Sequence, residues 1–154
     1  MELTRTGYLK QINLLLGNQD YARAYEVASE LARKSPGLEP YYMLGIAAYW
    51  NGKFKVAAEK GQAALSLAKS KDDIITCSLL ISSAFYRMGE YKKGFDALKA
   101  SESIGYNARV EEMLIYLSVA LRNEKEALRH TKNLFMLNRK MAIRFMERAA
   151  KNAK

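Results

Sequence analysis

The side chains that most often carry catalysis or bind metals are scarce in this chain. Among 154 residues there is one histidine, His130, and one cysteine, Cys77. A single cysteine excludes an internal disulfide and any metal site built from several cysteines. A histidine that acts as a general base needs a positioned partner, and no serine or cysteine stands near His130 at the spacing of a nucleophile. We therefore predict that the protein is not an enzyme and that it has no catalytic residue, bound metal, cofactor or small-molecule substrate.

Structural roles account for the reactive residues that are present. Cys77 precedes an apolar run, residues 78–81, and is expected to pack rather than to react. His130 is expected at the surface of a helix or hydrogen-bonded in the core. The paired acids at 72–73 and 111–112 lie where helices are expected to begin, and negative charge there complements the helix dipole. The function is therefore to be sought in a binding surface.

Length and composition are those of one globular domain. A chain of 154 residues is long enough to bury a core, and its apolar fraction of 49% is too high for intrinsic disorder. No apolar run approaches the length of about 20 residues that a membrane-spanning helix needs. Residues 1–5 lack the basic-then-apolar order of a signal peptide, so we expect a cytoplasmic protein.

Positive charge is concentrated at the C-terminal end. Residues 125–154 contain nine bases against Glu126 and Glu147, a formal charge of +7 out of the total of +9. Such asymmetry is typical of chains that bind nucleic acid or an anionic surface. A well-solvated terminal helix is the alternative explanation.

An internal repeat organises the chain. Four segments share a turn, an aromatic residue and a small residue three positions later, although the fourth is degenerate; they are residues 18–24, 51–57, 88–94 and 121–127. The small residues are spaced by 33, 37 and 33 positions, and they are Ala24, Ala57, Gly94 and Ala127. A period of this size indicates stacked helix pairs or propeller blades.

Hydrophobic periodicity favours helix pairs. Before the first turn, Leu9, Ile12 and Leu16 recur at helical spacing, and a second amphipathic stretch follows the turn. Breakers lie at 35–37, 71–73 and 105–107, and no segment alternates with a period of two for long enough to indicate a strand. We predict an all-α fold of roughly nine helices, two for each repeat and a last one from about Arg139 to Lys151.

The repeat resembles the tetratricopeptide repeat (TPR) family. The second repeat carries the pattern best, with Tyr41, Leu44, Gly45, Gly52, Phe54, Ala57 and Ala64, and the third supplies Phe85, Gly89, Tyr91 and Gly94. The fourth departs from it at Arg122 and Glu124. The resemblance implies a right-handed α-solenoid of about four helix pairs in a single domain over 1–154, with repeats at 5–37, 38–71, 72–106 and 107–138 and a capping helix at 139–152.

In this family the first helix of each pair lines a concave groove. The resemblance then assigns to the groove Tyr42, Met43, Ile46, Tyr49, Trp50, Thr76, Leu79, Leu80, Ser83, Tyr86, Arg87, Arg109, Glu112, Met113 and Tyr116, and from the first repeat Thr6, Leu9, Lys10, Asn13 and Leu16. Tyrosine, methionine, tryptophan and arginine are enriched at protein interfaces. We predict a scaffold or adaptor that binds an apolar or amphipathic protein segment in this groove. Core packing of these side chains, or self-association into homo-oligomers, is the alternative.

The terminal helix offers a second binding mode. Its bases form a basic patch consisting of Arg139, Lys140, Arg144, Arg148 and Lys151. Ala142, Phe145 and Met146 form an apolar face, which we expect to dock onto the last repeat. Binding of nucleic acid or of an anionic membrane surface through the patch is the alternative function.

Overall fold

The computed structural model describes residues 2–105 and 107–152, and within these residues it contains nine α-helices and no strand. The helices are α1 (Arg5–Gly17), α2 (Tyr21–Lys34), α3 (Leu38–Trp50), α4 (Phe54–Ser66), α5 (Lys71–Arg87), α6 (Tyr91–Glu102), α7 (Ala108–Ala120), α8 (Glu124–Leu137) and α9 (Arg139–Asn152). The all-α prediction is therefore confirmed.

The helix pairs are built on one kind of tight turn. In each pair a residue of the turn has a positive φ angle, and the four residues are Gln19 (60°), Gly52 (76°), Gly89 (75°) and Arg122 (55°). Glycine adopts this left-handed conformation without a steric penalty, which explains the glycines of the second and third turns. The first and fourth turns keep the same geometry with non-glycine residues, at a cost of about 1–2 kcal/mol each.

Side-chain caps fix several of the helix starts. The hydroxyl of Ser70 accepts a hydrogen bond from the backbone N–H of Asp73, and the side chain of Asn107 accepts from the N–H groups of Arg109 and Val110. These bonds satisfy backbone donors that a helix leaves free in its first turn. The start of α7, and with it the direction of Arg109, is therefore defined.

Small residues bring neighbouring helix pairs close together. A Cβ atom on Gly45 of α3 would lie 2.7 Å from Cδ2 of Leu80, and one on Gly61 of α4 would lie 2.8 Å from Cγ1 of Ile81. Because of this contact α5 packs tightly against both helices of the preceding pair. The buried residues form four clusters along the row. The core is rich in alanine, including Ala24, Ala28, Ala47, Ala48, Ala57, Ala64 and Ala84.

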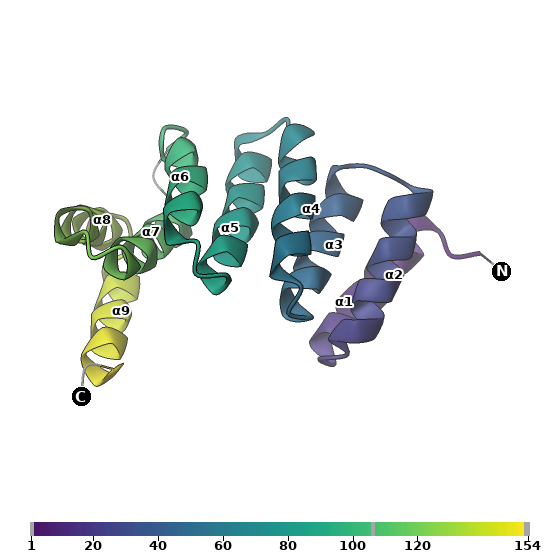
Figure 1. Cartoon of the computed structure of the whole chain (residues 1–154), viewed down its shortest axis with the longest axis horizontal. Coiled ribbons are helices and arrows are strands. Elements are labelled where there is room, and N and C mark those ends of the chain that lie inside the picture. Colours follow the sequence, from purple (N-terminus) through teal and green to yellow (C-terminus); the bar gives the residue numbers. More distant parts are fainter. Residues whose placement is uncertain (1, 106, 153–154) are drawn as a thin grey trace.

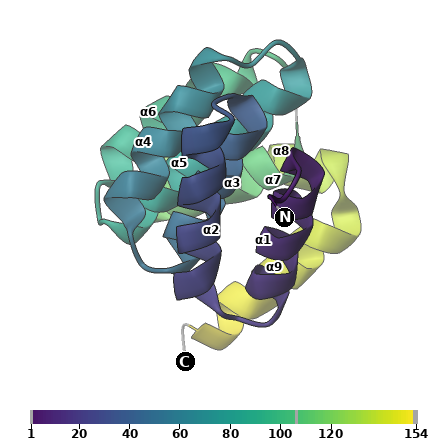
Figure 2. The ribbon, with the colours of Figure 1, turned by 90° about the vertical axis from the view of Figure 1, so that its right-hand side faces the viewer.

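The helices follow one another in a row from the N-terminal to the C-terminal end (Figure 1). Helix α3 contacts both α1 and α5, and α5 also contacts α7, whereas α2, α4 and α6 do not contact one another. Viewed from the N-terminal end, α4 and α6 lie on the outer side together with α2 (Figure 2). Helices α1, α3, α5 and α7 therefore form the inner row. None of the helices in the described ranges has the combination of length and apolar character that crossing a bilayer requires.

Candidate functional site

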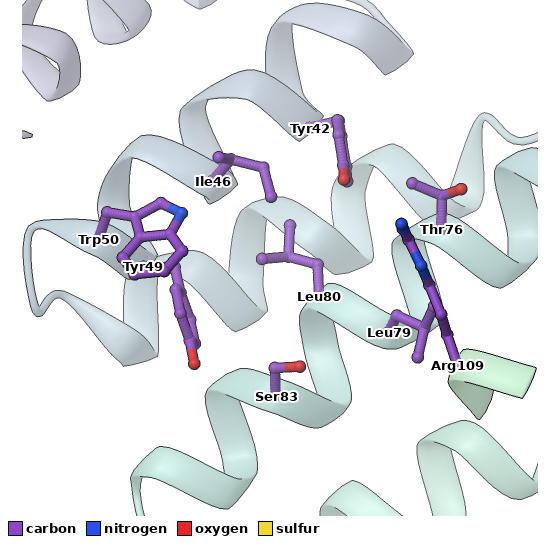
Figure 3. A pocket seen from close by; sticks show the side chains of 9 residues that line it. All are labelled: Tyr42, Ile46, Tyr49, Trp50, Thr76, Leu79, Leu80, Ser83 and Arg109. Atoms are coloured by element: carbon purple, nitrogen blue, oxygen red, sulfur yellow. The ribbon is translucent and has the colours of Figure 1, made fainter. Parts of the chain in front are cut away.

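A cleft opens on the inner row between α3, α5 and α7 (Figure 3). Its volume is about 330 Å³, and its lining consists of Tyr42, Ile46, Tyr49, Trp50, Thr76, Leu79, Leu80, Ser83 and Arg109. All nine residues belong to the face that the repeat pattern assigns to the groove. The cleft is mainly apolar, with hydroxyl groups and one guanidinium at its margins.

Helix α3 supplies the aromatic wall of the cleft. Tyr42, Ile46 and Tyr49 recur about once per turn, so that they share one face of the helix, and Trp50 ends it. The Trp50 ring stacks on Tyr21 of α2 at 5.9 Å and meets Tyr49 edge-on at 5.5 Å. It nevertheless remains 54% exposed. A large, fixed and half-exposed aromatic surface is typical of an anchor for a partner.

Helix α5 forms the floor and the opposite wall. Thr76, Leu79 and Ser83 lie along one face of this helix, and the buried Leu80 closes the bottom of the cleft. The cleft does not reach the nearby thiol of Cys77, which is buried as the sequence predicts. Burial raises the pKa of Cys77 to about 11, so this thiol is protonated and unreactive at neutral pH.

Arg109 is the one charged residue that lines the cleft, within the described part of the chain. It lies in the first turn of α7, and its side chain passes Leu79 with its nitrogen atoms on the side of Thr76 and Tyr42 (Figure 3). Burial raises the pKa of Tyr42, and the positive charge of Arg109 opposes that shift. No described carboxylate forms an ion pair with Arg109. The cleft is therefore suited to an apolar group that carries a negative charge at one end.

The remaining predicted groove residues lie outside this cleft. Met43 packs against the core formed by α1, α2 and α3, and Met113 packs against the core beneath α7. Tyr86 contacts Tyr91 and Tyr116, and the Arg87 guanidinium lies 4.6 Å from the Phe54 ring centre. Tyr116 meets Phe145 of α9 edge-on at 5.1 Å. None of these five side chains lines the cleft, and neither do Glu112 and the predicted groove residues of α1. Packing alone does not set the cleft residues apart, because Tyr42, Ile46 and Tyr49 also pack against the core between α3, α4 and α5. Partner binding by the predicted set stays a prediction.

Helix α9 caps the last pair through a narrow face. Ala142 is fully buried, and Phe145 packs with it against Ile115 and Leu134. This docking agrees with the expectation for Ala142 and Phe145, but not for Met146, which is 45% exposed. The five bases of the basic patch are exposed.

A second polar cluster lies behind α7, on the side away from the cleft. His130 and Glu111 have no exposed side-chain surface, and the His130 Nδ1–H donates to Glu111 Oε2 over 2.6 Å. The other ring nitrogen, Nε2, lies 3.2 Å from Glu126 Oε2. Arg129 bridges Glu126 and Glu102 at 3.1 and 3.0 Å. These residues come from α6, α7 and α8, so the cluster ties three helices together.

Charged side chains of both signs surround the histidine. The carboxylates of Glu102, Glu111 and Glu126 and the cationic groups of Lys99 and Arg129 belong to one cluster. Arg129 Nη2 also lies 3.3 Å from His130 Nε2. A hydrogen bond from Arg129 is the largest effect that lowers the pKa of Glu126, to about 2. Burial by itself raises the pKa of Glu102, but the hydrogen bonds and charges of Arg129 and Lys99 outweigh it and lower this pKa below its ordinary value.

The same cluster contains the metal-type donors of the described chain. One donor atom each from Glu102, Glu111 and His130 lie within 4.8 Å of one another, a spacing that a divalent cation can bridge. Two cationic side chains already pair with Glu102, however, and the His130 and Glu111 side chains are closed to solvent. The arrangement therefore fits an ion-paired link between helices better than a metal centre or a catalytic pair. Glu111 and Glu126 as partners of His130 were not predicted from the sequence.

Comparison with known proteins shows which solved structures have a similar fold. No family model and no curated protein matches the sequence. Solved structures do match. The crystal structure of MamA has 20% identity and a TM-score of 0.73, over 90% of this chain and 75% of that one. YrrB, a TPR protein with an unusual peptide-binding site, has 15% identity and a TM-score of 0.74, over 94% of this chain and 75% of that one. The APC/C assembly Cut9–Hcn1 has 18% identity and a TM-score of 0.79, over 96% of this chain and 30% of that one.

These similarities define the class of structure as an α-solenoid of stacked helix pairs. More narrowly, the chain has the tetratricopeptide repeat fold, as its turn and aromatic pattern predicted.

Proposed function

We propose that this chain is a non-catalytic scaffold that binds a segment of another protein in the cleft between α3, α5 and α7. One observation carries the proposal: an open, mainly apolar cleft on the inner row is bordered by the half-exposed Trp50 and by Arg109, which has no carboxylate partner in the described chain. An unpaired arginine beside exposed aromatic area is the composition of a binding hot spot.

The lining also defines the chemistry of the bound segment. An apolar side chain fits over Ile46, Leu79 and Leu80, and a carboxylate one or two residues away reaches Arg109. The bound segment is therefore amphipathic, with an acidic residue beside a bulky apolar one. The similarity to YrrB, a TPR protein with a peptide-binding site, agrees with this proposal without locating the site in this chain.

A selection of peptides from a random library tests the proposal, because it does not require the partner to be identified first. A phage-displayed library is selected on the purified chain, and the enriched peptides are synthesised and their dissociation constants measured. We expect a bulky apolar residue close to Asp or Glu in the enriched sequences. Truncation of an anchor typically costs about 2 kcal/mol or more, so Trp50→Ala should weaken these peptides about 30-fold.

Matched variants separate the cleft from the rest of the surface. Leu14→Ala removes a similarly exposed apolar side chain on α1, and Arg33→Ala removes an exposed arginine at the end of α2. Both should leave affinity unchanged, whereas Arg109→Ala should weaken acidic peptides and spare versions in which the acid is replaced by its amide. Equal affinities for wild type, Trp50→Ala and Arg109→Ala would show that binding takes place elsewhere.

A further inference from the structure

Helices α8 and α9 lie at the C-terminal end of the row (Figure 1). Several large apolar side chains on these two helices are exposed. Met136 at the end of α8 is 84% exposed, and Phe135, Leu137, Ile143 and Met146 are also exposed. Elsewhere in the described chain such side chains are exposed singly or in small numbers, which is normal for a protein surface. Here they are concentrated on the two helices that meet at the corner between α8 and α9, and we refer to these five residues as the apolar corner.

The segment that forms α8 and α9 carries most of the net positive charge of the protein. Residues 125–154 have a formal charge of +7. Lys140, Arg144, Arg148 and Lys151 recur at about one per turn on the face of α9 opposite the buried Ala142. No described carboxylate lies within ion-pair distance of these four bases. Their charge is therefore available to an external anion.

We propose that the apolar corner and the basic patch together bind the surface of an anionic lipid bilayer. At the edge of a membrane, apolar side chains enter the boundary of the acyl chains while lysine and arginine pair with headgroup phosphates. The helical positions agree with this arrangement, because Ile143 lies on the flank of α9 between the docked face and the basic face. The helix lies along the surface and does not cross it.

The apolar corner distinguishes this partner from a nucleic acid. Both partners are polyanions and both use the basic patch. Aliphatic side chains such as Met136, Ile143 and Met146 contribute little to the binding of nucleic acids. The bases of single strands stack on aromatic rings, and duplex backbones contact cations and hydrogen-bond donors. Phe135 is the one aromatic ring in the apolar corner, and the Arg139 guanidinium lies 5.6 Å from the centre of its ring. The combination of bulky aliphatic groups with charge favours the lipid surface.

Flotation with lipid vesicles tests the inference on the full chain. The probes are vesicles of pure phosphatidylcholine and vesicles of phosphatidylcholine mixed with an equal part of phosphatidylglycerol. We expect binding to the anionic vesicles only, and a steep fall in binding as salt concentration is raised. Binding to neutral vesicles of equal strength would overturn the inference, as would no binding to either kind.

Two variants divide the contributions of charge and apolar area. One is Lys140→Gln/Arg144→Gln/Arg148→Gln, and the other is Met136→Ser/Ile143→Ser/Met146→Ser, which keeps the charge unchanged. Each should lower the partition coefficient by about tenfold or more. The control Lys55→Gln/Lys92→Gln/Lys93→Gln removes equal charge from exposed positions on α4 and α6 and should bind as wild type does. All of the substituted side chains are exposed, and circular dichroism verifies that the variants are folded.

Binding of an oligothymidylate completes the test. The proposal is wrong if the serine variant keeps the wild-type affinity for vesicles, because charge alone is then the determinant. It is also wrong if wild type fails to bind vesicles while wild type and the serine variant bind the oligothymidylate equally tightly. Loss of vesicle binding in the serine variant at unchanged charge supports the lipid surface.

Discussion

Replacement of His130 by alanine should destabilise the C-terminal half of the solenoid far more than any surface substitution. The change removes the partner that Glu111 contacts over 2.6 Å, and neither side chain has exposed surface. Glu111 then remains in the core without its shortest hydrogen bond, and only the longer contact from Asn133, at 3.4 Å, is left to it. A buried acceptor that loses its partner typically costs about 1–3 kcal/mol, and more where the acceptor is charged. The alanine side chain also leaves a cavity.

The chain contains a matched control for this effect. Lys92 and Asp96 on α6 form an ion pair at the same distance, 2.6 Å, but their side chains are 72% and 58% exposed. Exposed pairs of this kind contribute about 0.3–0.5 kcal/mol, because solvent screens the charges and both side chains lose freedom. Lys92→Ala should therefore leave the free energy of unfolding nearly unchanged. The difference between the two variants measures the combined effect of burial and of the cavity that His130→Ala leaves.

Urea unfolding followed by two probes makes the prediction specific to one part of the chain. Far-UV circular dichroism reports all helices, whereas the fluorescence of the single tryptophan, Trp50, reports α3 and its surroundings. Repeat arrays are stabilised by nearest-neighbour contacts, so damage at one end need not reach the other. In His130→Ala we expect the dichroism to be lost at lower urea concentration, and the fluorescence transition to shift less.

Two results would refute this reasoning. One is a loss of less than about 1 kcal/mol in His130→Ala, which would mean that the cluster adds no more than a surface pair does. The other concerns Glu111→Gln, which preserves volume and an acceptor for the His130 Nδ1–H but removes the charge. If this variant is as stable as wild type while His130→Ala is not, the cavity and not the ion pair sets the cost.

Three further predictions follow from particular contacts. Glu126 has a folded-state pKa of about 2, below its unfolded value. Its contribution to stability is therefore complete above about pH 4.5 and is lost as the pH falls toward 2. The urea midpoint of wild type should drop over this range more than that of Glu126→Gln. Arg122 has a positive φ of 55°, so Arg122→Gly should raise the free energy of unfolding by up to about 1 kcal/mol. Gly52 has a φ of 76°, so Gly52→Ala should lower the free energy of unfolding. A loss of stability in Arg122→Gly would contradict the strain argument. The Cys77 thiol is buried with its pKa raised to about 11, so iodoacetamide at neutral pH should label it only after unfolding; rapid labelling of the native chain would show that α5 opens there.

The repeat pattern was enough to predict the fold because its signals are local. Gly52 and Gly89 mark turns that need a positive φ, and the helical spacing on each side does not depend on distant residues. The same logic fails where a non-glycine residue takes the turn position. Gln19 and Arg122 occupy the equivalent left-handed conformation, held there by the packing of the helix pairs, and their residue types give no indication of it.

The candidate site was predictable only as far as helical spacing reaches. Tyr42, Ile46 and Tyr49 share a face of α3 that lines the cleft, although all three are half-buried against the core between α3, α4 and α5. The neighbouring Met43 is rotated by about 100° around the helix and packs against the core of α1, α2 and α3 instead. Tyr116 looks equally suitable from the sequence and stays 38% exposed, but its ring packs against Phe145 of α9 and lies outside the cleft. Sequence spacing within one helix cannot indicate which part of its face a later helix covers.

The His130–Glu111 pair connects stability with the proposed function. The two residues are 19 positions apart and lie on different helices, so their contact follows from the stacking of α7 on α8 and from no local pattern. Arg109 stands two residues before Glu111 on α7, and residues two apart on a helix point to opposite sides. The cluster behind α7 thus holds the helix that carries Arg109 into the cleft. In His130→Ala, peptides whose binding depends on Arg109 should consequently lose more affinity than peptides whose binding depends on Trp50 alone.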